Sequence, residues 1–265
     1  MAKLELETLE SKLSLNYTVL GQGQRSLLLL NGAGLPLEFW GDLPAHLAED
    51  YHVIQMDQRN AGHSEYSGSF TLNDVAADVA SLLAHLEVKR VTIAGHAWGA
   101  RVAQVFARDY PHLCEALVIC CNGGYFPPAD TGDTQNEMRD AMRAGDRQTW
   151  EAMLAIQFCG DGFRDREPAI FKSMADVIWH HRPNSKARWN PKVSPPSSYW
   201  GLATMPALLI YGDEDKNGTI ENAEHLHARL KESRLHILKG CGHFAIREKE
   251  QEVISLIREF LSKLS

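Results

Sequence analysis

A turn near the middle of the chain has the residue spacing of a nucleophile site. Residues 95–99 read Gly-His-Ala-Trp-Gly, and they follow a short apolar run and precede a helical pattern. In the G-x-S-x-G nucleophile elbow, small residues flank the central one because the backbone approaches itself closely in a sharp strand-to-helix turn. The central position here holds Ala97, so the sequence predicts the turn without its nucleophile. The backbone amide of Trp98 would point at the position of a substrate oxyanion.

A carboxylate and a histidine follow two later apolar runs. GDED (212–215) comes at the end of PALLIYG, and GCGH (240–243) comes at the end of SRLHILKG. Polar groups at the carboxyl ends of parallel strands lie on the ligand-binding side of an open sheet. We therefore predict that Asp215 fixes the tautomer of His243, and that His243 acts as a general base and then as a general acid. Elbow, acid and histidine follow each other in the order of a Ser-Asp-His triad.

A glycine-rich turn would complete this site. Asn31-Gly32-Ala33-Gly34 follows an apolar run, and the amide of Ala33 would join that of Trp98 in an oxyanion hole. Asn31 is a candidate substrate-binding residue. Taken alone, such a sequence is more often only a tight turn. The chain has neither a G-x-G-x-x-G fingerprint nor a Walker lysine, which argues against nucleotide binding.

Short apolar runs alternate with helical patterns along most of the chain. The expected strands are residues 13–21, 26–31, 52–57, 90–95, 113–121, 206–212 and 233–240, and the expected helices are 72–88, 100–110 and 246–264. The first strand alternates like an edge strand. This order predicts a doubly wound, mostly parallel sheet with helices on both faces.

The pattern changes between about residues 125 and 200. Apolar residues there follow helical spacing in pieces, and large aromatic residues are frequent. We expect a helical cap at 125–200, inserted into an α/β core of residues 1–124 and 201–265, with the active site between them. Most of the aromatic side chains would form the core of the cap. The candidates for contact with the substrate are Trp150, Phe158 and Trp179.

The composition excludes several classes of partner. Lys+Arg of 27 and Asp+Glu of 34 give a net charge of −7, which argues against nucleic acid and anionic membranes. No apolar run approaches the ~18 residues of a membrane span, and the N-terminus lacks a signal-peptide pattern. The five cysteines fit neither a disulfide framework nor a zinc site, so we expect free thiols in a reducing cytoplasm, with Cys114, Cys120 and Cys121 buried. The adjacent His180 and His181 have no ligand spacing, and we expect neither metal nor cofactor.

Five motifs resemble those of the α/β-hydrolase superfamily, in the same order and over nearly the whole chain. They are NGAG (31–34) for HGxG, DQRNAGHS (57–64) for DxRGxGxS, GHAWG (95–99) for GHSxG, GDED (212–215) for GxxD, and GCGH (240–243) for GxGH. The resemblance implies an α/β-hydrolase fold that acts on a small ester, lactone or amide. It assigns the acid to Asp215 and the base to His243. In some relatives the acid follows an earlier strand, at the place held here by Asn122.

A narrower similarity concerns the residues around the elbow. DQR, GHAxGA, the CNGG turn and Asn31 resemble the aminoacrylate/carbamate hydrolase of pyrimidine degradation. The resemblance implies that alanine at the elbow is natural in that subgroup. The expected cap region shows no comparable motif.

Ala97 therefore has three interpretations. In the first, which the sequence alone makes us prefer, it is an engineered Ser→Ala in an ordinary hydrolase. In the second it is natural, and His243 activates water for attack on a small reactive substrate, such as a carbamate. In the third the protein is a ligand-binding module built on an inactive hydrolase. The sequence leaves open whether the chain is a monomer or a homodimer.

Overall fold

A single mixed sheet runs through the molecule. The structure is a computed structural model that describes residues 1–8, 12–122, 132–188 and 203–264, with only the backbone at 132 and 182–188. Its strands are β1 (Ala2–Glu7), β2 (Lys12–Leu20), β3 (Ser26–Leu30), β4 (His52–Met56), β5 (Val91–His96), β6 (Cys114–Cys120), β7 (Ala207–Gly212) and β8 (Ser233–Leu238). Within the described residues they pair in the order β1-β2-β4-β3-β5-β6-β7-β8. The pairs from β4 to β8 are parallel, and β1 and β2 are added antiparallel. The predicted doubly wound sheet is confirmed.

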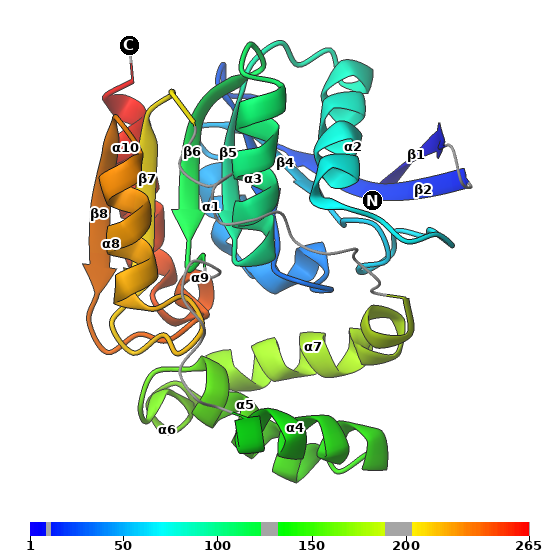
Figure 1. The fold of residues 1–265 in the computed structure, drawn as a ribbon, viewed down its shortest axis with the longest axis vertical. Coiled ribbons are helices and arrows are strands. Elements are labelled where there is room, and N and C mark those ends of the chain that lie inside the picture. Colours follow the sequence, from blue (N-terminus) through cyan, green and yellow to red (C-terminus); the bar gives the residue numbers. More distant parts are fainter. Residues whose placement is uncertain (9–11, 123–131, 189–202, 265) are drawn as a thin grey trace.

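The central strands are mostly apolar and almost entirely buried because helices cover both faces of the sheet. The outer helices are α1 (Leu43–Leu47), α2 (Leu72–His85), α3 (Trp98–Asp109), α8 (Ile220–Arg229), α9 (Ala245–Glu248) and α10 (Glu250–Ser262). In β3, Leu28 and Leu30 pack into the cluster under α2, α3 and α8, whereas Leu27 and Leu29 pack under α1 and α10. Each of these fully buried leucines contributes roughly 1.5–3 kcal/mol of transfer free energy. The sheet is therefore a rigid base for the loops at its carboxyl edge (Figure 1).

Four helices form a layer beyond the carboxyl ends of the parallel strands (Figure 1). They are α4 (Gly132–Ala144), α5 (Arg147–Phe158), α6 (Phe163–Arg166) and α7 (Pro168–Arg188). Asp146 caps α5 by accepting a hydrogen bond from the Thr149 amide at 3.1 Å. All four fall inside the expected cap interval, but both boundaries of that interval lie outside the described residues. So do the aromatic residues Trp189, Tyr199 and Trp200.

Two elements differ from the sequence-based expectation. The strand expected at the edge of the sheet, β2, lies between β1 and β4. The sequence of β1, Ala-Lys-Leu-Glu-Leu-Glu, alternates charge and leucine, and this strand forms the exposed edge. The single helix expected over 246–264 is divided into α9 and α10 at Lys249, whose φ is −133°. Glu248 turns inward there, and its carboxylate accepts hydrogen bonds from the Gly160, Gly242 and Phe244 amides.

Within the part of the chain that the structure describes, no helix has the length and apolar character needed to cross a bilayer.

Candidate active site

The elbow connects β5 to α3, with Ala97 at its apex. Ala97 has φ 50° and ψ −109°, a left-handed conformation that is strained for any residue with a Cβ. Its amide donates a hydrogen bond to the Cys120 carbonyl at 2.9 Å, which ties the apex to the neighbouring strand. Strain of about 1–3 kcal/mol persists only where the surroundings fix the conformation. The protein therefore retains the backbone of a nucleophile turn with a methyl group at the nucleophile position.

The two glycines of the elbow are required by close backbone contacts. A Cβ on Gly95 would lie 2.5 Å from the Ala100 nitrogen and from the Gly99 carbonyl. A Cβ on Gly99 would lie 2.1 Å from the Leu30 carbonyl oxygen. Both distances are far shorter than a van der Waals contact. The spacing that the sequence analysis singled out is thus a steric requirement of the turn.

The variant Gly99→Ala is expected to lose at least about 3 kcal/mol of unfolding free energy, the upper end of the usual cost of overpacking. The reason is that its new methyl group meets the backbone of β3 and not a movable side chain. Urea unfolding followed by circular dichroism measures the effect. Gly145→Ala is the matched control, because Gly145 has φ +77° and no atom within 4 Å of its added Cβ. It should lose only about 1–2 kcal/mol, and an equal loss in both variants would contradict the steric account.

His243 and Asp215 form a buried hydrogen-bonded pair. The His243 Nδ1 lies 2.9 and 3.0 Å from the two carboxylate oxygens of Asp215. The exposed fractions of the two residues are 7% and 5%. Asp213, the other carboxylate of the motif, instead pairs with Lys239 at 3.3 Å. Because a carboxylate accepts, Nδ1 carries the proton and Nε2 is left as the basic atom of the imidazole.

The surroundings of Asp215 keep it ionised. Its Oδ1 accepts hydrogen bonds from the Asn217 and Gly218 amides, both at 2.8 Å. Burial alone would raise the pKa of Asp215, but His243 and these two amides outweigh burial and hold the pKa below its ordinary value. An ionised carboxylate at Nδ1 stabilises the imidazolium that forms when Nε2 takes a proton.

His96, the second residue of the elbow, is hydrogen-bonded to the loop that carries His243. Its Nε2 lies 2.8 Å from the His243 carbonyl oxygen, so it must donate and its proton resides on Nε2. Burial lowers the pKa of His96 to about 3, and the neighbouring His243 acts in the same direction, so the ring is neutral at pH 7. The elbow is therefore linked to the loop that carries His243 by a hydrogen bond that requires the Nε2-protonated tautomer of His96. This role of His96 was not predicted from the sequence, although the residue lies inside the elbow motif.

The base loop is also joined to the end of α5. The His243 amide donates to the Phe158 carbonyl at 2.7 Å. A Cβ on Gly242 would lie 2.4–2.6 Å from backbone atoms of residues 158–160. The loop can approach α5 this closely only because position 242 lacks a side chain. The loop that carries His243 is therefore packed directly against the C-terminal end of α5.

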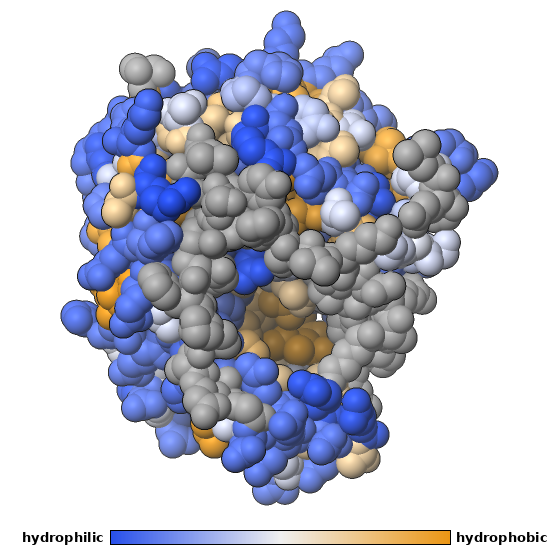
Figure 2. All heavy atoms as spheres, in the orientation of Figure 1, coloured by the Kyte–Doolittle hydropathy of each residue, from blue (hydrophilic) through white to orange (hydrophobic). Residues whose placement is uncertain are grey.

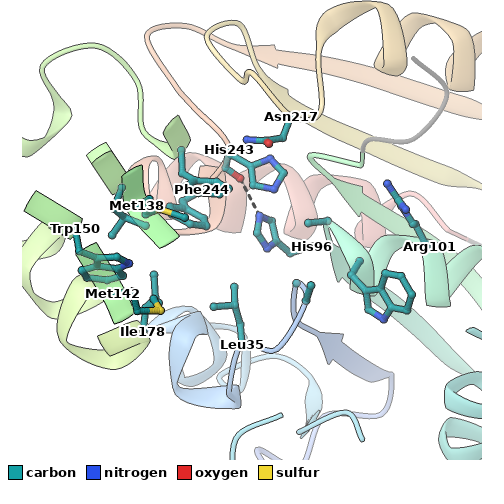
Figure 3. A pocket seen from close by; sticks show the side chains of 16 residues that line it. Leu35, His96, Arg101, Met138, Met142, Trp150, Ile178, Asn217, His243 and Phe244 are labelled. Carbon is teal, nitrogen blue, oxygen red and sulfur yellow. Dashed lines mark hydrogen bonds between the residues drawn. The ribbon is translucent and has the colours of Figure 1, made fainter. Parts of the chain in front are cut away.

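A cavity of about 460 Å³ lies between these groups and the helical layer. It is lined by Gly32, Ala33, Leu35, His96, Ala97, Trp98, Arg101, Met138, Met142, Trp150, Leu154, Phe158, Ile178, Asn217, His243 and Phe244. Figure 2 shows an apolar hollow between the strand ends and the α4–α7 layer. Figure 3 shows the polar groups of the cavity, His243, His96, Asn217 and Arg101, beside its apolar side chains. The lining therefore suits a small organic molecule with one polar reacting centre.

The structure brings most of the sequence-predicted site residues to this cavity. Ala97, His243, Ala33, Trp98, Trp150 and Phe158 line it, and Asp215 lies behind His243. Asn31 does not line it: the residue is 1% exposed, and its side-chain amide donates to the Pro36 carbonyl. Trp179 does not line it either, because its ring packs on Trp150 at 5.2 Å between centroids and faces a separate hollow. The expected substrate contacts of Asn31 and Trp179 therefore do not fit their positions.

Several cavity residues were not anticipated. Asn217 could have been inferred because it lies two residues after the acid, and Arg101 because it lies one helical turn after Trp98. Leu35, Met138, Met142, Leu154, Ile178 and Phe244 carry no sequence signal of their own. They are apolar residues whose neighbours are set by tertiary packing alone.

A family model and several known proteins match most of the chain. The family model described as alpha/beta hydrolase fold matches residues 25–250. The uncharacterized hydrolase YugF of Bacillus subtilis is 26% identical over 81% of this chain and 82% of its own length. The putative carbamate hydrolase RutD of Escherichia coli is 25% identical over 82% of this chain and 80% of its own length.

Solved structures show the same fold. An esterase from Thermogutta terrifontis, solved with malate bound, superposes with a TM-score of 0.80 at 21% identity and covers 100% of this chain and 99% of its own. The esterase RhEst1 from Rhodococcus superposes with a TM-score of 0.81 at 22% identity over 100% of both chains. The matched model spans most of the sequence, including the elbow, Asp215 and His243. The chain belongs to the α/β hydrolase fold family.

Proposed function

We propose that this protein hydrolyses a small reactive carbonyl compound, a carbamate or an activated ester or lactone, with water as the direct nucleophile. The observation that carries the proposal is the buried His243–Asp215 pair, complete and facing a cavity in which the elbow presents only the methyl group of Ala97. A general base with a fixed tautomer can activate water directly when the elbow offers no side-chain nucleophile.

The reaction balances with the groups in the cavity. Nε2 of His243 takes a proton from water as the oxygen attacks the carbonyl carbon. The amides of Ala33 and Trp98 then stabilise the oxyanion of the tetrahedral intermediate. When this intermediate collapses, the bond to the leaving group breaks, and His243 returns the proton to that group. Asp215 favours the transient imidazolium throughout. No covalent intermediate forms.

Two observations support Ala97 as the native residue, contrary to the preference from sequence alone. The chain is similar over 82% of its length to putative carbamate hydrolases. The sequence around the elbow resembles that subgroup, and this resemblance implies that an alanine is natural there. An ordinary esterase with its serine replaced is the competing explanation, and a ligand-binding protein is the other. The Ala97→Ser and His243→Ala experiments in the Discussion separate the three.

The cavity suggests an anionic or strongly polar substrate end. Arg101 and Trp150 lie on opposite sides of the reacting groups (Figure 3). The Arg101 side would receive a carboxylate or carbamate oxygen, because guanidinium matches carboxylate geometry. The Trp150 side, together with Met142 and Ile178, would receive a small apolar group. A volume of about 460 Å³ limits the substrate to a small molecule.

The variant Arg101→Met should lower kcat/KM about 10–100-fold for a substrate that carries a carboxylate, since a hydrogen bond to a charged group is worth about 1.5–3 kcal/mol. Hydrolysis of a neutral ester of the same size should change little. Steady-state rates on a matched pair of substrates measure the difference. Arg108→Met, on the same helix but outside the cavity lining, is the control. Equal losses on both substrates would exclude Arg101 as the charge-selecting residue.

A further inference from the structure

A second cluster of ligand-type side chains lies where α7 meets the core. Glu38 comes from the short helix η1 (Leu37–Trp40), His63 from the loop after β4, and His181 from α7. One ligand atom of each lies within 4.8 Å of the other two. We propose that these three side chains form a zinc-binding site that fastens α7 to the core. This proposal does not depend on the proposed function.

The spacing suits a tetrahedral ion with nitrogen and oxygen ligands. The His63 Nε2 lies 3.3 Å from Glu38 Oε1. Metal–ligand bonds of about 2.0–2.1 Å give a tetrahedral edge of roughly 3.4 Å, so this pair already has the separation of two zinc ligands. The His63 and His181 rings meet at 87° with centroids 5.2 Å apart. Two histidines and one glutamate are an established zinc donor set that leaves a fourth position for water.

Unsatisfied buried atoms point to a missing partner at this place. His181 is 8% exposed, and its Nδ1 is buried with no hydrogen-bond partner. Oε2 of Glu38 is likewise buried without a partner. Buried polar atoms without partners are costly in native structures, and each requires a physical explanation. A bound cation would draw both side chains toward itself and remove that cost.

The surroundings of the cluster leave room for an ion. The positive charge nearby, that of Arg147, is already paired with carboxylates. Glu38 and His181 border a hollow of about 380 Å³ together with Trp179 and Arg147. Arg147 is engaged in ion pairs with Glu151 and Asp176, so its charge is compensated. The exposed side of His63 gives the ion a path of entry.

Asp57 holds two of the ligands in place. Its carboxylate accepts hydrogen bonds from the Leu37 amide at 2.6 Å and from the His63 amide at 2.8 Å. Leu37 adjoins Glu38 in the chain, so the backbones of both ligand residues are fixed to one buried group. Glu38 and His63 are thereby held near each other, and His181 on α7 is the third member of the cluster. Zinc would therefore act on the position of α7, which also contributes Ile178 to the cavity.

The test is metal binding to the full chain and to matched variants. Zn²⁺ is titrated against a chromophoric chelator, and Co²⁺ is used as a spectroscopic probe. The expected result is one tight equivalent, and at least tenfold weaker binding in His63→Ala and in His181→Ala. His180→Ala is the control, because His180 adjoins His181 but is not in the cluster, and its affinity should equal that of the wild type. Zinc should raise the thermal unfolding temperature of the wild type and of this control only.

The competing cluster gives a different signature. Cys121, Asp215 and His243 also have ligand atoms within 4.8 Å of one another. Cobalt bound there would show a thiolate charge-transfer band that disappears in Cys121→Ala, whereas cobalt on Glu38, His63 and His181 shows none. That band, unchanged affinity in His63→Ala, or absence of zinc binding would overturn the proposal. His63 is exposed, so its replacement leaves the fold intact and keeps this outcome interpretable.

Discussion

Ala97→Ser is expected to give the protein a covalent route on activated esters, with a burst of product equal to the enzyme concentration. The elbow backbone at φ 50° already has the nucleophile conformation, and a hydroxyl on the same Cβ would face the cavity that His243 lines. His243 would take the hydroxyl proton and the serine oxygen would attack the carbonyl. On an ester that the unsubstituted protein does not hydrolyse, the rate gain can approach about 10⁶-fold, the factor lost when a serine nucleophile is removed from a hydrolase. The rate on a carbamate, the substrate suited to water attack, should change little.

Stopped-flow kinetics with a nitrophenyl ester measures the burst, and steady-state carbamate turnover is measured on the same preparation. The double variant Ala97→Ser/His243→Ala should show no burst, because the serine then lacks its base. A large gain on every substrate, carbamates included, would identify Ala97 as a substituted nucleophile in an ordinary esterase. A serine variant inactive on all substrates would favour the ligand-binding interpretation.

His243→Ala is expected to lower turnover of the wild-type reaction about 10²–10⁴-fold, the usual contribution of a positioned general base. Water in the cavity would then lose the imidazole nitrogen of the ring that Asp215 orients. His236→Ala is the control, since His236 is exposed on β8 and lies outside the cavity lining. Its turnover should match that of the wild type.

In the same experiment, Asp215→Asn tests the contribution of the carboxylate that orients His243 separately from proton transfer by His243 itself. The amide cannot stabilise the imidazolium, so turnover should fall although His243 remains. Circular dichroism and thermal unfolding of each variant confirm that the fold is retained. Activity that survives the loss of His243 would exclude every mechanism described here, the covalent one included.

The features that the sequence predicts well are those encoded locally. The inner parallel strands β3 and β7 are buried and mostly apolar, and the elbow is a fixed spacing of glycines whose steric reason is visible at Gly99. Asp215 and His243 could be assigned because strand ends meet at one edge of the sheet. The edge strand β1 was missed because charged residues alternate with its leucines, a pattern that also suits a solvated segment.

The features that the sequence did not predict depend on tertiary packing. Met138 and Met142 reach the cavity because α4 lies above it, and no local pattern marks them as lining residues. Glu38, His63 and His181 are far apart in the chain and come from three different elements. The expectation of no metal came from spacing along the chain, and spacing says nothing about ligands brought together by folding.

The tight packing of Gly242 against residues 158–160 also limits how this protein can be recombined with its relatives. A chimera that takes the α4–α7 layer from another hydrolase would bring a foreign backbone against the loop that carries His243. The foreign backbone could not come closer to Gly242 than residues 158–160 do here, because even a Cβ on Gly242 would overlap that backbone. A chimera that folds would have to take both the α4–α7 layer and residues 240–248 from the same parent, although these two segments are separated in the sequence. If the proposed function holds, the α4–α7 layer and His243 form one module, and directed evolution of this protein would have to vary them jointly.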